Sequence, residues 1–223
     1  MPRDARAVAI GFPHHIVHRG NNKGRVFFDK EDRAQYLYLL KKYAAKWNSP
    51  LLAYCLMTNH VHLLTRPLKQ PSLPKMMQGI ALCYTQYVNR KYRRSGRLWE
   101  TRYYSSIVGE ERYLWAVVRY IEQNPQRARI TKCVEDYPYS SARAHLQAEY
   151  DHLLGEELFS EWQRSEYLQF FNEAFYNDGL KQIRVATRSN KPFGSQAFTK
   201  MMEEKLNLMF ETKPRGRPKY AGN

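Results

Sequence analysis

Acidic residues are nearly absent from the middle of the chain. Between residues 33 and 109 the one carboxylate is Glu100. Nucleases that use two metal ions, and related enzymes that cage their metals with carboxylates, need several acidic side chains that converge on one point. The sequence therefore argues against carboxylate-based phosphoryl transfer.

Cysteine is scarce, and long apolar runs are missing. The three cysteines, Cys55, Cys83 and Cys133, are widely spaced and odd in number, which fits a reduced compartment and argues against a disulfide framework. No apolar run approaches the roughly 18 residues that a membrane-spanning helix needs, and no charged-then-apolar leader opens the chain. We expect a cytoplasmic protein without a membrane span.

Positive charge is what the sequence has in excess. The formal net charge is +15; residues 1–150 hold 25 Lys and Arg against 11 Asp and Glu, whereas residues 151–223 hold 11 against 10. The excess of positive charge in residues 1–150 is typical of proteins that neutralise the phosphates of nucleic acid. A protein that binds DNA in this way would be associated with the nucleoid. The alternative is a basic face that only favours solubility. We expect DNA contacts from ten residues: Arg19, Lys75, Arg90, Lys91, Arg93, Arg94, Arg97, Arg102, Arg215 and Arg217.

Apolar patterns bounded by turn-forming residues predict four strands. They are expected at residues 13–20, 51–57, 60–66 and 98–108, and the second and third form a hairpin through Thr58-Asn59. A helix follows the first strand, another follows the third and another follows the fourth. This order favours an α+β fold with a ferredoxin-like antiparallel sheet and helices on one face over a doubly wound parallel sheet.

The starts and ends of these helices are predicted from capping residues. Asp29 is suited to cap a helix that runs to about residue 48, and Ser72 opens the second helix. The third runs from about residue 110 to Asn124, where Pro125 stops it because the residue before proline avoids the helical region.

Composition changes near residue 150, and the chain is predicted to have three parts. Residues 1–150 carry the sheet, residues 151–212 look like a small helical domain, and a helix-turn-helix across residues 178–209 is one reading of it. Residues 213–223 include a Lys-Pro-Arg-Gly-Arg-Pro-Lys run that resembles an AT-hook, which binds a narrow minor groove. A disordered basic tail is the alternative reading of the last part.

Two histidines one position apart, His60 and His62, are the first candidate for chemistry. In a strand, side chains at positions i and i+2 lie on the same face with Cα atoms about 6.6 Å apart. The two imidazoles could therefore bind one metal ion, while Val61 and Leu63 face the opposite, buried side. An H-x-H pair is weak evidence by itself, and a metal site would need a third ligand.

The third predicted helix offers that ligand together with a nucleophile. Tyr120 and Asn124 are four residues apart, so they lie on one side of the helix at the flank of its apolar stripe, and Arg119 and Glu122 point away from that stripe. Taken singly, Tyr120 could be a tyrosine at the edge of the core and Asn124 a simple helix terminator before proline.

Two imidazoles and an amide oxygen leave coordination positions open for a phosphate oxygen. A divalent ion bound there could act as a Lewis acid, and Mn²⁺ suits the mixed nitrogen and oxygen ligands better than Mg²⁺. Tyrosine ionises near pH 10, so as a nucleophile it needs a nearby cation. A phosphotyrosine intermediate would conserve the energy of the broken phosphodiester and would allow strand transfer rather than hydrolysis alone.

Five segments in order resemble a known family. These are HIVHRGNNKGRVFF, YCLMTNHVHLL, GRLWETRYYSSIV, YLWAVVRYIEQNPQRARI and DYPYSSARAHL, which together span roughly residues 8–146. They look like the single-tyrosine HUH transposases, in particular the branch of REP-associated tyrosine transposases.

The resemblance implies an HUH domain that nicks single-stranded DNA near hairpins of palindromic repeats and forms a 5′-phosphotyrosine. It implies that His60 and His62 are metal ligands, that Tyr120 is the nucleophile and that Asn124 is the third ligand, bound to Mg²⁺ or Mn²⁺. In distant relatives the position of the third metal ligand is usually glutamine, so Asn124 departs from the family pattern. Its side chain is shorter and could bind the metal through water. Family members act as monomers or as homodimers with exchanged helices.

Two other functions stay open at the level of sequence. The first is a non-catalytic DNA-hairpin-binding regulator derived from such a transposase, in which the histidine site is idle. The second is metal-dependent cleavage of RNA on a similar sheet, which a comparison of DNA and RNA hairpins would separate because only RNA carries the 2′-hydroxyl.

Overall fold

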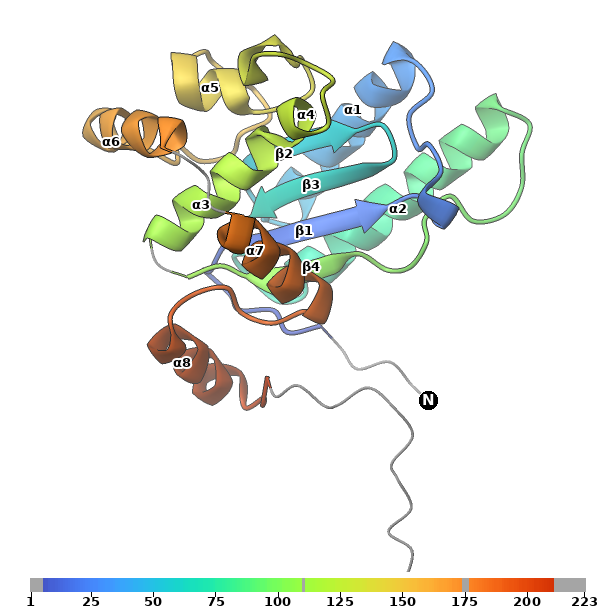
Figure 1. Cartoon of the computed structure of the whole chain (residues 1–223). Coiled ribbons are helices and arrows are strands. Elements are labelled where there is room, and N and C mark those ends of the chain that lie inside the picture. Colours follow the sequence, from blue (N-terminus) through green and yellow to red (C-terminus); the bar gives the residue numbers. More distant parts are fainter. Residues whose placement is uncertain (1–5, 110, 174–176, 211–223) are drawn as a thin grey trace, which may run out of the picture.

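A four-stranded antiparallel sheet forms the centre of the molecule (Figure 1). The computed structural model describes residues 6–109, 111–173 and 177–210. The strands lie side by side in the order β2-β3-β1-β4. Their bounds are β1 His14–Arg19, β2 Leu51–Met57, β3 His60–Thr65 and β4 Tyr104–Ile107. The α+β class and the ferredoxin-like arrangement expected from the sequence are confirmed.

The β2–β3 hairpin turns at Thr58-Asn59, as predicted, and its register places Cys55 opposite His62. Alternation along β3 sends Val61 and Leu63 into the hydrophobic core on one face, and His60 and His62 to the other face. Each residue of β2 is buried, because helices cover both faces of the sheet.

Two helices, α1 (Lys30–Lys46) and α2 (Ser72–Lys91), pack on one face. Asp29 caps α1 through a capping box in which its side chain accepts from the Asp32 N–H and Asp32 accepts from the Asp29 N–H. The buried stripe of α2 meets that of α1 over the sheet, and Tyr84 lies wholly inside this layer. The sequence prediction placed helices on one face of the sheet; α1 and α2 lie on this face, whereas α3, the third predicted helix, lies on the other.

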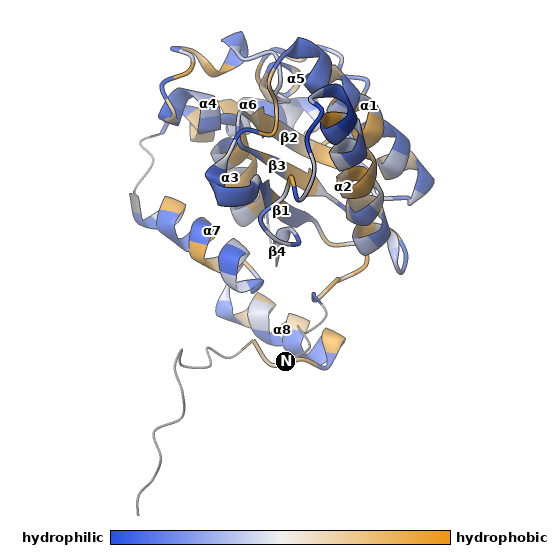
Figure 2. Ribbon diagram, turned by 90° about the vertical axis from the view of Figure 1, so that its right-hand side faces the viewer, coloured by the Kyte–Doolittle hydropathy of each residue, from blue (hydrophilic) through white to orange (hydrophobic). Residues whose placement is uncertain are grey.

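The opposite face is covered by α3 (Glu111–Glu122) and α7 (Asn177–Ser189). Figure 2 shows the strands between α3 and α7 on one side and α1 and α2 on the other. Helix α7 is held at its C-terminal end because the following residues hydrogen-bond to β4: Ser105 N–H donates to Asn190 and Phe193 N–H donates to the Ile107 carbonyl. The edge strand is thereby covered.

The C-terminal helices contribute their apolar side chains to the core of the sheet. The C-terminal helices besides α7 are α5 (Ala142–Gln147), α6 (Glu161–Asn172) and α8 (Gln196–Leu206). The remaining short elements are α4 (Asn124–Arg127) and the 3₁₀ turns η1 (Asn21–Lys23) and η2 (Val134–Asp136). Tyr167 and Phe171 of α6 and Ile183 of α7 belong to the same hydrophobic cluster as Leu52 and Val117. The domain boundary near residue 150 and the helix-turn-helix stay predictions, and the basic tail at residues 213–223 lies outside the described residues.

Two boundaries differ from the sequence prediction. The strand expected at 98–108 is limited to β4, because residues 100–103 leave the ladder. Trp99 keeps only an isolated bridge to Gly20, and its indole stacks on the ring of buried His18 with centroids 3.9 Å apart. Helix α3 ends at Glu122, and Pro125 lies in the first turn of α4 rather than after a helix end. Proline is tolerated there because the first N–H groups of a helix have no helical partner.

Arg119 and Glu122 of α3, which the sequence analysis placed away from the apolar stripe of the helix, are buried among the C-terminal helices. The Glu122 carboxylate accepts hydrogen bonds from Ser141, His145 and Tyr167. These bonds tie α3 to α5 and α6. Within the described ranges, every helix is too short or too polar to cross a bilayer.

Candidate active site

His60, His62, Tyr120 and Asn124 line one cavity of about 240 Å³ on the face of the sheet that α3 and α7 cover. The ring centroids of the two histidines are 4.9 Å apart, and the ring of Tyr120 lies edge-on to His62 with centroids 5.4 Å apart. The structure thus brings together, within one chain, all four residues that the sequence assigned to chemistry. Their roles stay predictions.

Burial favours the neutral form of both histidines, and a neutral imidazole is the form that binds metals. Burial, with smaller contributions from the neighbouring rings, lowers the pKa of His62 well below its usual value, and burial together with Arg19 lowers the pKa of His60 to about 4. Each ring uses Nδ1 for a hydrogen bond, His60 to Asn59 Oδ1 (2.7 Å) and His62 to His15 Nε2 (3.0 Å). No hydrogen bond among the described residues reaches Nε2 of either histidine, so both Nε2 atoms are available to a cation.

Asn124 is oriented by the end of α3. The carbonyls of the last helical turn lack helical partners, and the Asn124 amide donates to two of them, Tyr120 O (2.9 Å) and Ile121 O (3.2 Å). Both bonds use the amide nitrogen, which leaves Oδ1 for a cation. Two neutral imidazoles and an amide oxygen suit a divalent ion such as Mg²⁺ or Mn²⁺ with open positions. No group of three His, Cys, Asp or Glu that could hold a metal occurs among the described residues, so Asn124 would have to complete the set.

Tyr120 has a cation beside it. The guanidinium carbon of Arg127 lies 4.6 Å from the centroid of the Tyr120 ring, and Arg127 Nη2 donates to the Tyr120 carbonyl (2.6 Å). Burial lowers the pKa of Arg127 to about 10, which still leaves it charged at neutral pH. The requirement that a tyrosine nucleophile has a nearby positive charge is met by a residue that the sequence analysis did not name.

Three more arginines line the cavity from two elements. Arg19 pairs directly with His60 in the β1–β3 ladder, and exposed Arg184 and Arg188 extend from α7. These three arginines give the cavity a positive lining that suits a phosphodiester. The α7 arginines lie more than 120 residues after the histidines, so no local pattern could connect them with the site.

His15 and Thr187 are also part of the site and were missed. His15 Nδ1 lies 2.9 Å from Thr187 Oγ1, and its ring is nearly parallel to that of His62, with centroids 5.3 Å apart. His15 belongs to a run of two histidines at the start of β1, and this run is a feature of the sequence that could have pointed to His15. Its proximity to His62 depends on the pairing of β1 with β3, in which Val17 is opposite His62.

The other basic residues predicted to bind DNA lie outside this cavity. Lys75, Arg90, Arg93, Arg97 and Arg102 are exposed on α2 and the segment after it, and Arg94 is half-buried. The segment approaches the site because Glu100 N–H donates to the Arg19 carbonyl. The predicted contacts of Arg215 and Arg217 lie outside the described residues.

Lys91 differs from its neighbours. Its ammonium donates to Asp29 (2.6 Å) and Asp32 (2.9 Å), and the Asp32 side chain is buried. The hydrogen bond from Lys91 holds the pKa of Asp29 well below its usual range. Because two carboxylates already balance this charge, we expect Lys91 to contribute less than its neighbours to phosphate binding.

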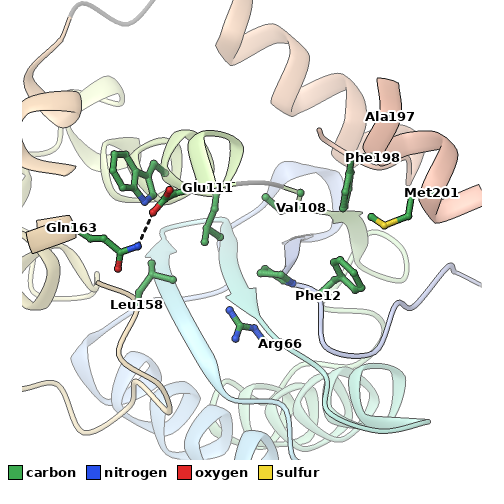
Figure 3. Close-up of a pocket in the computed structure, with 13 residues that line it drawn as sticks. Phe12, Arg66, Val108, Glu111, Leu158, Gln163, Ala197, Phe198 and Met201 are labelled. Carbon is green, nitrogen blue, oxygen red and sulfur yellow. Dashed lines mark hydrogen bonds between the residues drawn. The ribbon is translucent and has the colours of Figure 1, made fainter. Parts of the chain in front are cut away.

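A larger cavity of about 690 Å³ lies elsewhere, between α3, α8 and the start of β1 (Figure 3). Its lining is mainly apolar, with Phe12, Phe198 and Met201 at one end and a hydrogen bond from Gln163 to Glu111 (2.6 Å) at the other. None of the residues predicted from sequence for catalysis or metal binding lines it. The smaller cavity is the candidate active site.

Comparison with known families shows which family the chain belongs to. The family model described as IS200-like transposase matches residues 11–124, just over half of the chain. The chain belongs to the IS200-like transposase family. The matched range includes all four candidate residues and ends at Asn124, whereas the α7 residues that complete the cavity lie beyond it.

Two relatives of this IS200-like transposase extend the comparison. A Haemophilus influenzae protein named as a REP-associated tyrosine transposase is 28% identical over 115 residues, which is 44% of this chain and 61% of the relative. The chain thus matches less than two thirds of that protein. A solved structure of a REP-associated tyrosine transposase bound to a REP hairpin has a TM-score of 0.55 and 17% identity, covering 73% of this chain and 96% of that one. At this identity the similarity shows the shared fold.

Proposed function

We propose that the protein is a metal-dependent enzyme that nicks single-stranded DNA near hairpins and transfers the strand, with Tyr120 as the nucleophile. The observation that carries the proposal is the convergence of Tyr120 with His60 and His62 in one cavity, with the Arg127 cation 4.6 Å from the tyrosine ring centroid. Membership of the IS200-like transposase family supports a transposase-like reaction on DNA.

The substrate phosphate would be bound by the positive lining of the cavity. Arg19, Arg184 and Arg188 can balance the charge of a phosphodiester, and Arg127 can stabilise charge on the phenolic oxygen of Tyr120. A divalent ion held by His60 Nε2, His62 Nε2 and Asn124 Oδ1 would supply Lewis acidity toward a phosphate oxygen.

The covalent step balances as follows. The Tyr120 oxygen forms a bond to phosphorus and loses its proton to solvent, while the bond from phosphorus to the 3′-oxygen breaks and that oxygen takes up a proton. The products are a 5′-phosphotyrosine and a free 3′-hydroxyl. Attack by another 3′-hydroxyl reverses the step, so a strand can be transferred without any other energy source.

A hairpin in single-stranded DNA is the proposed substrate. The related structure is bound to a REP hairpin, and the exposed basic residues of 75–102 offer contacts for a backbone that continues from the cavity. The four catalytic and metal-binding candidates come from one chain, so a monomer would contain a complete site, and a homodimer would contain two.

Covalent capture tests the proposal. The full chain is incubated with a 5′-labelled hairpin single strand and with a 3′-labelled copy, in Mn²⁺, in Mg²⁺ and in EDTA. We expect a protein-linked product from the 3′-labelled copy with the metals, none in EDTA, and none from Tyr120→Phe. The matched control is Tyr38→Phe, which removes the hydroxyl of an exposed tyrosine on α1.

Two outcomes contradict the proposal in different ways. A covalent product that persists in Tyr120→Phe excludes this nucleophile. Hairpin binding that survives EDTA with no covalent product in any divalent ion indicates a non-catalytic regulator instead. An RNA hairpin of the same sequence is included, since cleavage restricted to RNA would indicate chemistry at the 2′-hydroxyl.

A further inference from the structure

His15 lies between His62 of the candidate metal site and Thr187 of α7. Its Nε2 is 3.0 Å from His62 Nδ1, and its Nδ1 is 2.9 Å from Thr187 Oγ1. All three side chains are at most 3% exposed, so water does not compete for these hydrogen bonds. The three groups form a continuous chain of hydrogen bonds from a helix on the surface of the sheet to a candidate metal ligand.

Helix α7 determines which atom donates and which accepts in each of these hydrogen bonds. Thr187 Oγ1 donates to the Ile183 carbonyl (2.8 Å), one turn earlier in α7. A hydroxyl has a single proton, so toward His15 the Thr187 oxygen can only accept, and His15 must donate through Nδ1. No carboxylate contacts the buried ring of His15 among the described residues, so the ring carries one proton and its Nε2 is an acceptor.

The same reasoning fixes His62. Because His15 Nε2 accepts, His62 must donate through Nδ1, and its Nε2 then carries a lone pair. If Thr187 donated to His15 instead, each proton would move to the other nitrogen of its ring, and His62 Nε2 would carry hydrogen. A protonated Nε2 cannot bind a cation, so the two arrangements differ in whether the site has its second imidazole ligand.

We propose that His15 and Thr187 are positioning residues that hold His62 in the tautomer whose Nε2 can bind a divalent cation. The inference rests on the proposed function for the identity of the ligand, but the hydrogen-bond chain itself is a property of the metal-free protein. It also assigns α7, which lies outside the range matched by the family model, a part in building the metal site.

Thr187→Val is the informative substitution. Valine keeps the shape of threonine but removes the acceptor for His15 Nδ1–H, so His15 is expected to move its proton to Nε2 and donate to His62. Disrupting the hydrogen-bonding partner of a metal ligand lowers affinity by about 10- to 100-fold, and we expect a loss in this range because the substitution changes His15, the partner of His62, from acceptor to donor. Thr187→Ser keeps the hydroxyl and should bind Mn²⁺ like the wild type.

The matched control is Thr85→Val on α2. Thr85 also donates to the carbonyl one turn earlier, Ala81 O (2.7 Å), but it lies on the other side of the sheet. The tautomer of His62 is read in the metal-free full chain by long-range ¹H–¹⁵N correlation, with the signals assigned by their loss in His62→Gln. Mn²⁺ affinity is measured by titration calorimetry, and thermal unfolding checks that each variant is folded.

The tautomer measurement decides the inference independently of activity. Hydrogen on His62 Nδ1 in the wild type and in Thr187→Ser, with a shift toward Nε2 and weaker Mn²⁺ binding in Thr187→Val, supports it. Hydrogen on Nε2 in the wild type overturns it, as does a Thr187→Val protein unchanged in both measurements. If Thr187→Val does not fold, the wild-type and Thr187→Ser spectra still decide. A wild type that binds no Mn²⁺ contradicts the proposed function, whereas its His62 spectrum tests the hydrogen-bond chain separately.

Discussion

The ring of Tyr120 stands edge-on to the ring of His62, with an interplanar angle of 83° and centroids 5.4 Å apart. Tyr120 comes from α3 and His62 from β3, elements separated by the 45 residues of 66–110. The contact depends on α3 lying across the face of the sheet, which brings the proposed nucleophile to the proposed metal ligands within one chain.

Arg127 should matter for the rate of nicking. Replacing it by glutamine removes the cation beside Tyr120, and loss of one group that stabilises developing charge costs about 10²- to 10³-fold in rate. Single-turnover formation of the covalent product measures the effect, and Arg127→Lys should recover part of it. Arg112→Gln, an exposed position on α3, is the control. Equal rates for Arg127→Gln and wild type would show that this cation has no electrostatic role.

Protonation of His14 should lower the stability of the protein in acid. Its Nε2 accepts from the Ala9 N–H (3.2 Å) and its Nδ1 bonds to the Phe12 carbonyl, so the folded protein needs the neutral ring. Burial lowers the pKa of His14 from 6.5 to about 4. The unfolded chain therefore binds more protons between these values, and stability should fall as pH drops from 6.5 toward 4, by up to about 3 kcal/mol for this ring.

Urea unfolding at pH 7 and at pH 4.5 measures that difference. His14→Gln should be less stable at pH 7 but should show a smaller loss between the two pH values. His152→Gln removes an exposed ring and serves as the control. A pH dependence of His14→Gln that matches the wild type would exclude His14 as its source.

Arg90 and Arg93 should contact DNA phosphates rather than bases. Each is exposed near the end of α2, and removal of one phosphate contact lowers the dependence of binding on salt by about one ion. We expect Arg90→Gln and Arg93→Gln to weaken binding to hairpins of different sequence alike, measured by fluorescence anisotropy at several salt concentrations. A loss confined to one base substitution would indicate base recognition instead.

Lys91, unlike Arg90, should affect the stability of the protein and not the salt dependence of DNA binding. Lys91→Met leaves the buried Asp32 without the cation that balances it, so the thermal unfolding temperature should fall. The salt dependence of hairpin binding should stay that of the wild type. A reduced salt dependence without loss of stability would place Lys91 in the group of phosphate-binding residues.

The sequence predicted those parts of the fold that depend on local patterns. Strand alternation placed Val61 and Leu63 in the core and the two histidines on the other face, and the side chain of Asp29 indicated the start of α1. Helical spacing put Tyr120 and Asn124 on one side of the third predicted helix, and both line the cavity although Asn124 belongs to α4.

The parts that were missed depend on pairing between distant segments. His15 joins the site through the register of β1 with β3, and Thr187 through the packing of α7 on the sheet. Lys91 looked like one member of a basic run because its partners, Asp29 and Asp32, are about 60 residues earlier. A single sequence carries no direct signal of such contacts.

The order of the elements around the cavity has a consequence during synthesis. The histidines of β3 leave the ribosome first, Tyr120 follows with α3, and Thr187 comes only with α7, near the end of the chain. A growing polypeptide therefore possesses both imidazoles and the phenol well before the helix that we propose to orient His62 exists. The cavity, and with it the proposed cleavage of DNA, is completed only late in translation.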